Sequence, residues 1–261
     1  MVKTQKNSGY KAEFNSCIET VSEVHKSHFR DAAKKGVSSW LTCLPLEEHG
    51  FLLNKKEFSD ALCLRYNLLV KGMPQYCACG KLNSVDHTME CAKGGYWYLR
   101  HNNVRDLEVN LLTEVCHDVV VEPRLLPLTG EVFPLQSTKK EDDAHPDISA
   151  RGVFRPMDKV FFDVRIFHPN AASNLASADA ILKHEKEKKR CYNQRIIDVE
   201  KGCFIPLVFS TNGAMGKEAD RFHKRLASLL AKKRNISYSE AISFIRCRIR
   251  FSSLNPRKCN S

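Results

Sequence analysis

Two acidic residues inside apolar, strand-like runs constrain this chain more than any other feature. The runs cover Ile148 to Ala150 and Val160 to Phe167, and a turn region containing Gly and Pro lies between them. They predict a β-hairpin with Asp147 near the start of one strand and Asp163 inside the other. A carboxylate in an apolar strand is costly to desolvate unless a cation meets it.

The second run also predicts which side chains share a face. Because strand side chains alternate, we expect one side to carry Phe161, Asp163, Arg165 and Phe167, and the other Val160, Phe162, Val164 and Ile166. Two carboxylates on neighbouring strands can share a hard divalent cation such as Mg²⁺ or Mn²⁺, which takes oxygen ligands. A metal-dependent nuclease centre is therefore our first hypothesis.

A cluster of soft ligands precedes the hairpin. The spacing is C-x-C-x7-H-x3-C, formed by Cys77, Cys79, His87 and Cys91. Four such residues in a short loop can close a tetrahedral Zn²⁺ site and stabilise a segment too small to have a core. The alternative is four unrelated residues in a chain with 11 cysteines. We favour zinc because the other cysteines are scattered and only these cluster with a histidine.

Positive charge is concentrated at the end of the chain. The formal net charge is +11 overall, and the segment 217–261 carries 12 Lys and Arg against three acids, a net +9. Such a segment attracts nucleic-acid phosphates, whereas the alternative is a solvated basic face without a partner. The basic side chains that we predict to bind nucleic acid here are Lys224, Arg225, Lys232, Lys233 and Arg234.

Cysteine usage and hydropathy bear on the compartment. The 11 cysteines are an odd number and no secretory leader precedes them, so we expect free thiols in a reducing compartment. No apolar run reaches the roughly 18 to 20 residues of a membrane span. We therefore expect no membrane partner.

Hydrophobic periodicity predicts the remaining elements in chain order. A capping box, Asn54 with Glu57, indicates a helix running to about Val70, ended by Gly72 and Pro74. The other expected elements are an N-terminal amphipathic helix within 1–38, a helix over 98–115, a strand over 119–121, an exposed connection over 124–144, a helix over 175–199, a strand over 203–211, and helices over 217–233 and 237–251.

The predicted helix over 175–199 carries charges within its apolar stripe. Ala178, Ile181, Tyr192, Ile196 and Val199 fall on one face, together with Glu185, Lys188 and Lys189. Glu185 and Lys189 can pair at i,i+4, and lysine stems can be buried with their ammonium in water. The functional interpretation is that Lys188 or Lys189 reaches the two acids.

This order of helix, three strands, helix and strand resembles the PD-(D/E)xK nuclease core, with Pro146-Asp147 and Asp163-Val164-Arg165 as its signature. Together with the preceding Cys/His cluster, Arg100-His101 and the Lys-rich helix, it is similar to the restriction-like endonuclease of non-LTR retrotransposon reverse-transcriptase polyproteins. The resemblance covers about residues 77–211, and 40–75 is similar to the segment that links such nucleases to the polymerase.

The resemblance implies an α/β fold with an αβββαβ core, a helical N-terminal extension, a small zinc knuckle and two C-terminal helices. The implied boundaries are 1–75 for a helical linker, 76–96 for the CCHC knuckle, 97–215 for the nuclease core and 216–261 for a basic helical extension. The chain contains no polymerase motifs, so we expect a fragment or remnant of a polyprotein.

The resemblance also implies an activity, which is Mg²⁺-dependent nicking of target DNA for target-primed reverse transcription, in the nucleus, with DNA and element RNA as partners. Asp147 and Asp163 are the implied metal ligands, and Lys188 or Lys189 is the implied catalytic lysine. Arg165 occupies the usual in-strand lysine position, where it stabilises charge but cannot act as a base.

Several alternatives remain open from the sequence. The chain is either an active nuclease or a catalytically inactive, zinc-containing nucleic-acid-binding module from the same kind of element, and a related nuclease of repair or phage type shares the signature. Arg100 and His101 either contact DNA or the active site, or stabilise the start of their helix. His168 is expected to be a structural residue at a strand end.

Overall fold

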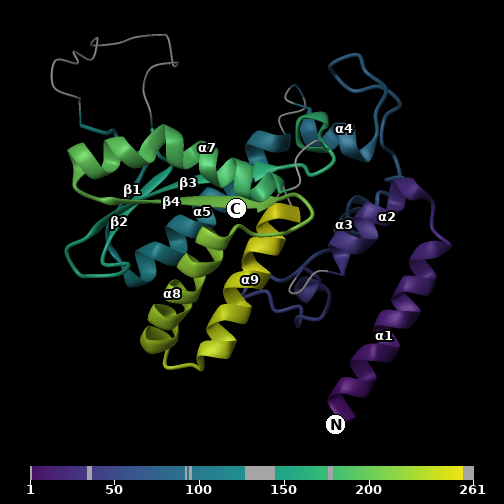
Figure 1. Ribbon diagram of the computed structural model, residues 1–261, viewed down its shortest axis with the longest axis horizontal. Helices are drawn as coiled ribbons and strands as arrows, with labels where there is room; N and C mark the ends of the chain where they lie inside the picture. The colour runs from purple at the N-terminus through teal and green to yellow at the C-terminus, as the bar shows by residue number, and fades with distance from the viewer. Residues whose placement is uncertain are drawn as a thin grey trace.

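The protein, seen here as a computed structural model, is a mixed α/β structure built on a four-stranded sheet (Figure 1). The structure describes residues 2–33, 37–91, 93, 96–126, 145–175 and 179–254. The strands lie in the order β1-β2-β3-β4, with β1–β2 and β2–β3 antiparallel and β3–β4 parallel. Their bounds are β1 His117–Val121, β2 Ile148–Arg151, β3 Lys159–Phe167 and β4 Cys203–Ser210.

Helices cover both faces of the sheet (Figure 1). Helix α5 (Tyr96–Val115) precedes β1, and α7 (Ala180–Arg195) connects the parallel strands β3 and β4. Helices α8 (Lys217–Arg234) and α9 (Tyr238–Leu254) follow β4. The predicted succession of helix, three strands, helix and strand is confirmed for these described elements.

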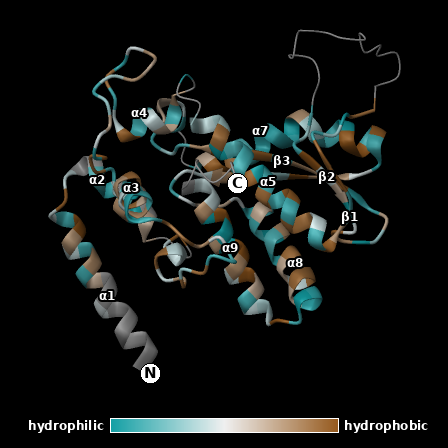
Figure 2. Ribbon diagram, turned by 180° about the vertical axis from the view of Figure 1, so that it is seen from behind, coloured by the Kyte–Doolittle hydropathy of each residue, from teal (hydrophilic) through white to brown (hydrophobic). Residues whose placement is uncertain are grey.

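The alternation predicted along β3 is also confirmed. Val160, Phe162 and Val164 belong to a large apolar core shared with α5, α8 and α9. Phe161 faces the opposite way, into a smaller cluster with Ile196 beyond the end of α7. The central strands are correspondingly hydrophobic in Figure 2, whereas the helices alternate between hydrophobic and hydrophilic positions. This alternation places Asp163 on the side of the sheet that α7 covers.

The N-terminal region differs from the prediction in two places. Instead of one helix within 1–38 there are two, α1 (Val2–Glu19) and α2 (Glu23–Ala32), interrupted by a turn at 20–22. Helix α3 (Lys55–Tyr66) has the predicted capping box, but it ends at Asn67 in the left-handed conformation rather than near Val70. Asn tolerates this conformation better than most residues, so it ends the helix before Gly72 and Pro74 are reached.

The predicted helix over 175–199 is divided. A short helix α6 (Ala172–Leu175) precedes α7, and a π-helical turn, η3 (Ile196–Glu200), follows it. Ala178 of the predicted stripe and the segment 127–144 of the predicted connection lie outside the described residues. The apolar stripe of α7 also includes His184, which is buried and was not predicted.

The C-terminal helices are integral to the core of the fold. Phe222, Leu226 and Ile245 of α8 and α9 are fully buried in the same cluster as the inner face of β3. The predicted boundary at residue 215 therefore does not separate two apolar cores. No helix within the described ranges is both long enough and apolar enough to cross a membrane.

Removing one ring from this core should show how much α8 contributes. The rings of Phe222 and Phe162 lie 4.7 Å apart and both are fully buried. We expect Phe222→Ala to lower the free energy of unfolding by about 3 to 5 kcal/mol, because it leaves a cavity. Urea denaturation measures both variants. The control Phe154→Ala, whose residue is 45% exposed, should lower the free energy of unfolding by less than about 1 kcal/mol. Equal effects would contradict the shared core.

Candidate active site and metal centre

The two acids predicted from the hairpin lie side by side. Ile148 pairs with Phe162 across β2 and β3, so Asp147 comes next to Asp163. The Asp147 carboxylate accepts a hydrogen bond of 2.6 Å from the Val164 backbone N–H. Both acids line one pocket. The hairpin thus brings the two carboxylates to the same place, as expected.

Lys188 is the lysine that reaches the acids. Its Nζ lies 2.6 Å from Oδ2 of Asp163. The neighbouring Lys189 instead forms an ion pair of 2.9 Å with Glu218 at the start of α8. Consecutive helix residues point about 100° apart, so one helix presents these two lysines to different partners. Of the two predicted candidates, Lys188 belongs to the site and Lys189 does not.

The environment of Asp163 raises its pKa. The residue is 3% exposed, and burial, followed by the neighbouring Asp147 carboxylate, raises its pKa from 3.8 to about 6 despite the opposing effect of Lys188. Burial and Asp163 also raise the pKa of Tyr192, whose hydroxyl donates a 3.4 Å hydrogen bond to the His145 carbonyl. Two carboxylates thus lie next to each other in this pocket, and a cation bound between them would relieve their repulsion.

The pair Arg100-His101 divides between the two predicted alternatives. His101 Nε2 lies 3.1 Å from Oδ1 of Asp147, so this side chain belongs to the site. The Arg100 guanidinium is buried and donates 3.0 Å hydrogen bonds to the carbonyl and sulfur of Met89. Arg100 is therefore not placed to bind nucleic acid; it connects α5 to helix α4 (Val85–Glu90).

The wall of the pocket includes residues that the sequence analysis did not single out. Trp97 and Tyr98, 45% and 54% exposed, lie at the start of α5, and Arg105 pairs with Glu122 at 2.8 Å. The sequence signal for this wall is the adjacent pair of aromatic residues, Trp97 and Tyr98, in the first turn of the helix that also carries His101. Arg165 is exposed and lines the same pocket.

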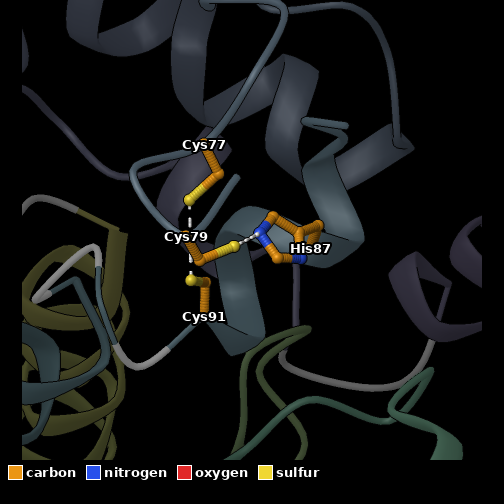
Figure 3. A group of neighbouring side chains, drawn as sticks. All are labelled: Cys77, Cys79, His87 and Cys91. Carbon is orange, nitrogen blue, oxygen red and sulfur yellow. Dashed lines mark hydrogen bonds between the residues drawn. The ribbon is translucent and has the colours of Figure 1, made fainter. Parts of the chain in front are cut away.

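The four predicted zinc ligands also converge, in a separate knuckle (Figure 3). Cys77 and Cys79 come from a tight loop in which Gly80 has a positive φ of 85° and donates a 2.8 Å hydrogen bond to the Cys77 carbonyl. His87 lies in α4, and Cys91 lies at its C-terminal cap. The Ser84 side chain caps the start of this helix by accepting a hydrogen bond from the His87 N–H.

The distances in the knuckle suit a tetrahedral metal. The four ligand atoms all lie within 4.8 Å of one another. The Sγ atoms of Cys77 and Cys91 are 3.5 Å apart, and Sγ of Cys79 is 3.2 Å from Nε2 of His87. Zinc–sulfur bonds of about 2.3 Å place two tetrahedral sulfurs about 3.8 Å apart. These residues could therefore hold a metal ion such as zinc.

The knuckle is tied to the sheet through His168. The imidazole contacts Asp86 of α4 at 2.7 Å and the Thr211 hydroxyl at the end of β4 at 2.7 Å. His168 is 5% exposed, so the expectation of a structural residue at a strand end is met by its contacts. The pKa of the Asp86 carboxyl is held below its usual range, chiefly by the hydrogen bond with His168. Asn170 and His28 act in the same direction, whereas burial opposes them.

Most of the basic side chains expected to bind nucleic acid are occupied within the fold. Lys224 pairs with Asp220, Arg225 donates to the Val153 carbonyl, and Lys233 donates to the Glu114 carbonyl. Arg234 forms a two-point ion pair with Glu114, whereas Lys232 is exposed. A count of charges in the sequence could not show these partners. The cations of α8 bind groups of α5, the turn between β2 and β3, and Asp220 of α8 itself.

Mutation of the knuckle should remove one metal. We expect the purified chain to carry about one zinc per molecule, and Cys79→Ser or His87→Ala to lose it, because a closed tetrahedral site needs all four ligands. Metal analysis by mass spectrometry measures this. The control Cys191→Ser changes an exposed cysteine on α7 and should retain the metal. Zinc-free wild type, or zinc retained in both ligand variants, would contradict the assignment.

Removal of the buried acid should make the protein more stable at neutral pH when no Mg²⁺ or Mn²⁺ is present. Because the pKa of Asp163 is higher in the folded chain, about 6, than its ordinary 3.8, the folded state binds this proton more tightly. This contribution to stability is thus present below about pH 4 and is lost as the pH rises through 6.

We therefore expect Asp163→Asn, in the zinc-loaded protein without Mg²⁺ or Mn²⁺, to raise the free energy of unfolding at pH 7.5 by about 2 to 3 kcal/mol and to change it little at pH 4. Denaturant titrations at both values measure this, with Asp158→Asn in the turn before β3 as control. An Asn variant less stable than wild type at pH 7.5 would contradict the raised pKa.

A scan against family models matches none, and a search of curated proteins finds no significant match. The functional interpretation accordingly rests on the residues and the geometry described above.

Proposed function

We propose that this protein is a metal-dependent DNA endonuclease of the PD-(D/E)xK type. The observation that carries the proposal is the convergence of Asp147, Asp163 and Lys188 in one pocket, with Lys188 Nζ 2.6 Å from Asp163. Two carboxylates and a lysine on an αβββαβ succession are the groups that such nucleases use. The proposed metal is Mg²⁺ or Mn²⁺, and the proposed substrate is a phosphodiester of DNA.

The residues fit a hard divalent cation. Magnesium is usually bound by one or two carboxylates together with water and substrate oxygens, and Asp147 and Asp163 supply the two carboxylates. When bound, the ion would activate water and neutralise the scissile phosphate. The Val164 N–H orients Asp147 by donating to Oδ2, and His101 contacts the other carboxylate oxygen, Oδ1.

The cations around the acids suit phosphoryl transfer. Lys188 neutralises Asp163 in the metal-free chain, and with a metal on the carboxylate its ammonium would be released toward the developing charge on the phosphate. Arg165 lines the same pocket, where a guanidinium stabilises charge and cannot serve as a base. The water-activating group is therefore not Arg165.

The biological context that we propose is nicking of target DNA for retrotransposon integration by target-primed reverse transcription, in the nucleus. The knuckle before α5, the succession of elements and the excess of Lys and Arg support it. DNA is the proposed substrate, and element RNA is a proposed further partner.

A second candidate is a zinc-containing nucleic-acid-binding module without catalysis. Two observations favour it, since Arg165 replaces the in-strand lysine and Lys188 already occupies Oδ2 of Asp163. Both candidates predict DNA affinity that falls steeply with salt. Only the nuclease predicts strand cleavage.

Cleavage of supercoiled plasmid separates the two. With Mg²⁺ or Mn²⁺ we expect wild type to nick the plasmid, and Asp147→Ala, Asp163→Ala or Lys188→Ala to reduce the rate at least about 100-fold, because each removes a group that holds the metal or stabilises charge. Quantified conversion to open circles measures the rate.

Lys189→Ala provides the matched control, because Lys189 neighbours Lys188 in sequence but pairs with Glu218. We expect this variant to nick within about threefold of wild type, as its ion pair is on the surface and contributes little. Absence of nicking by wild type, or nicking that survives both Asp variants, would defeat the nuclease proposal and favour the binding module.

A further inference from the structure

A second cationic pocket lies between the start of α8 and the last turns of α9, and the proposed nuclease reaction does not use it. Its lining includes four cations, Lys217, Lys224, Arg246 and Arg250, and one carboxylate, Asp220. The formal charge of these lining residues is therefore +3. None of them lines the pocket that contains Asp147 and Asp163.

Arg250 is the unusual member of this pocket. The residue is only 8% exposed, and its guanidinium donates no hydrogen bond to a carboxylate or carbonyl within the described parts of the chain. Its nearest charged neighbours include other arginines, Arg65 and Arg246, and burial followed by Arg65 lowers its pKa from 12.5 to about 10. A buried charge without a counter-charge is strongly unfavourable.

The surrounding groups do not neutralise Arg250. The Asp220 carboxylate is shared between Lys224 at 2.6 Å and Arg246 at 3.2 Å. The start of α8 is capped by a side chain of α7, because the Glu218 N–H donates a 3.0 Å hydrogen bond to the Glu185 carboxylate. The side chains, rather than the helix terminus, therefore set the positive potential of the pocket.

The chain also leaves room for the guanidinium. Gly213, in the turn after β4, has a φ of 92°, and a Cβ at this position would overlap the Arg250 Nη1 atom. Glycine is favoured twice here, by its backbone conformation and by the close approach of the arginine. The guanidinium thus lies close to Gly213 in the wall of the pocket.

We propose that this pocket binds a phosphate group, either a free phosphate or a phosphate of a nucleic-acid backbone. The planar guanidinium donates two parallel hydrogen bonds that match phosphate oxygens. The excess of +3 suits free phosphate, which carries up to two negative charges, and also a nucleic-acid backbone, whose successive phosphates carry one charge each. Arg250 supplies the buried fork, and Lys217 and Arg246 supply charge at the rim.

Thermal unfolding of the zinc-loaded protein, without added Mg²⁺ or Mn²⁺, tests the pocket without any cleavage assay. At constant ionic strength, we expect inorganic phosphate at about 100 times its Kd to raise the Tm of wild type by about 5 °C, and acetate to have little effect. Arg250→Met, which keeps the volume but removes the charge, should lose the phosphate-dependent shift and have a higher Tm than wild type in phosphate-free buffer.

Two further variants keep the result interpretable. Arg250→Lys retains charge without the fork, so it should keep part of the shift even if the Met variant folds poorly. Arg248→Met changes the neighbouring arginine that donates to the His49 carbonyl, and it should retain the full shift. An equal shift in wild type and both Arg250 variants, or an equal response to acetate, would overturn the proposal.

DNA binding by the zinc-loaded protein, without added Mg²⁺ or Mn²⁺, distinguishes the two sources of phosphate. If the ligand is a backbone phosphate, Arg250→Met should weaken binding of a labelled duplex about tenfold in anisotropy titrations, and inorganic phosphate should compete in wild type only. If the ligand is free phosphate, DNA affinity should be unchanged while the phosphate shift persists. Absence of both effects would refute the pocket and leave the nuclease proposal untouched.

Discussion

The structure is organised around a carboxylate buried in the middle of an apolar strand. Asp163 lies on the face of β3 that α7 covers, and it is tolerated there because Lys188 meets it at 2.6 Å. Desolvation and the neighbouring Asp147 still raise its pKa to about 6. An apolar residue at this position would avoid the cost of burying a charge, and it is this cost that motivates the proposed role of Asp163 in binding a cation.

The rest of the chain holds this arrangement in place. The β2–β3 register brings Asp147 beside Asp163, and α5 carries His101 to Asp147. The knuckle connects to the same elements, because Arg100 donates to Met89 in α4 and Asp86 pairs with His168 at the end of β3. Loss of order in the knuckle would therefore disturb Arg100 at the start of α5, which is next in sequence to His101, the residue that contacts Asp147.

The sequence predicted the parts of this account that depend on local patterns. Alternation along β3, the capping box at Asn54 and the Cys/His spacing each follow from local geometry, and the structure contains all three. The sequence could not show which of Lys188 and Lys189 reaches the acids, because that depends on the rotation of α7 about its axis relative to the sheet. Nor could charge counting show that Arg234 pairs with Glu114, some 120 positions earlier.

A direct test of the central claim is binding of Mn²⁺ to the zinc-loaded protein, followed by electron paramagnetic resonance. If Asp147 and Asp163 share one hard cation, wild type should bind about one Mn²⁺ that Mg²⁺ displaces, and Asp163→Asn should lose it. Wild type that binds no Mn²⁺, or a variant that binds it unchanged, would contradict a shared metal between the two acids.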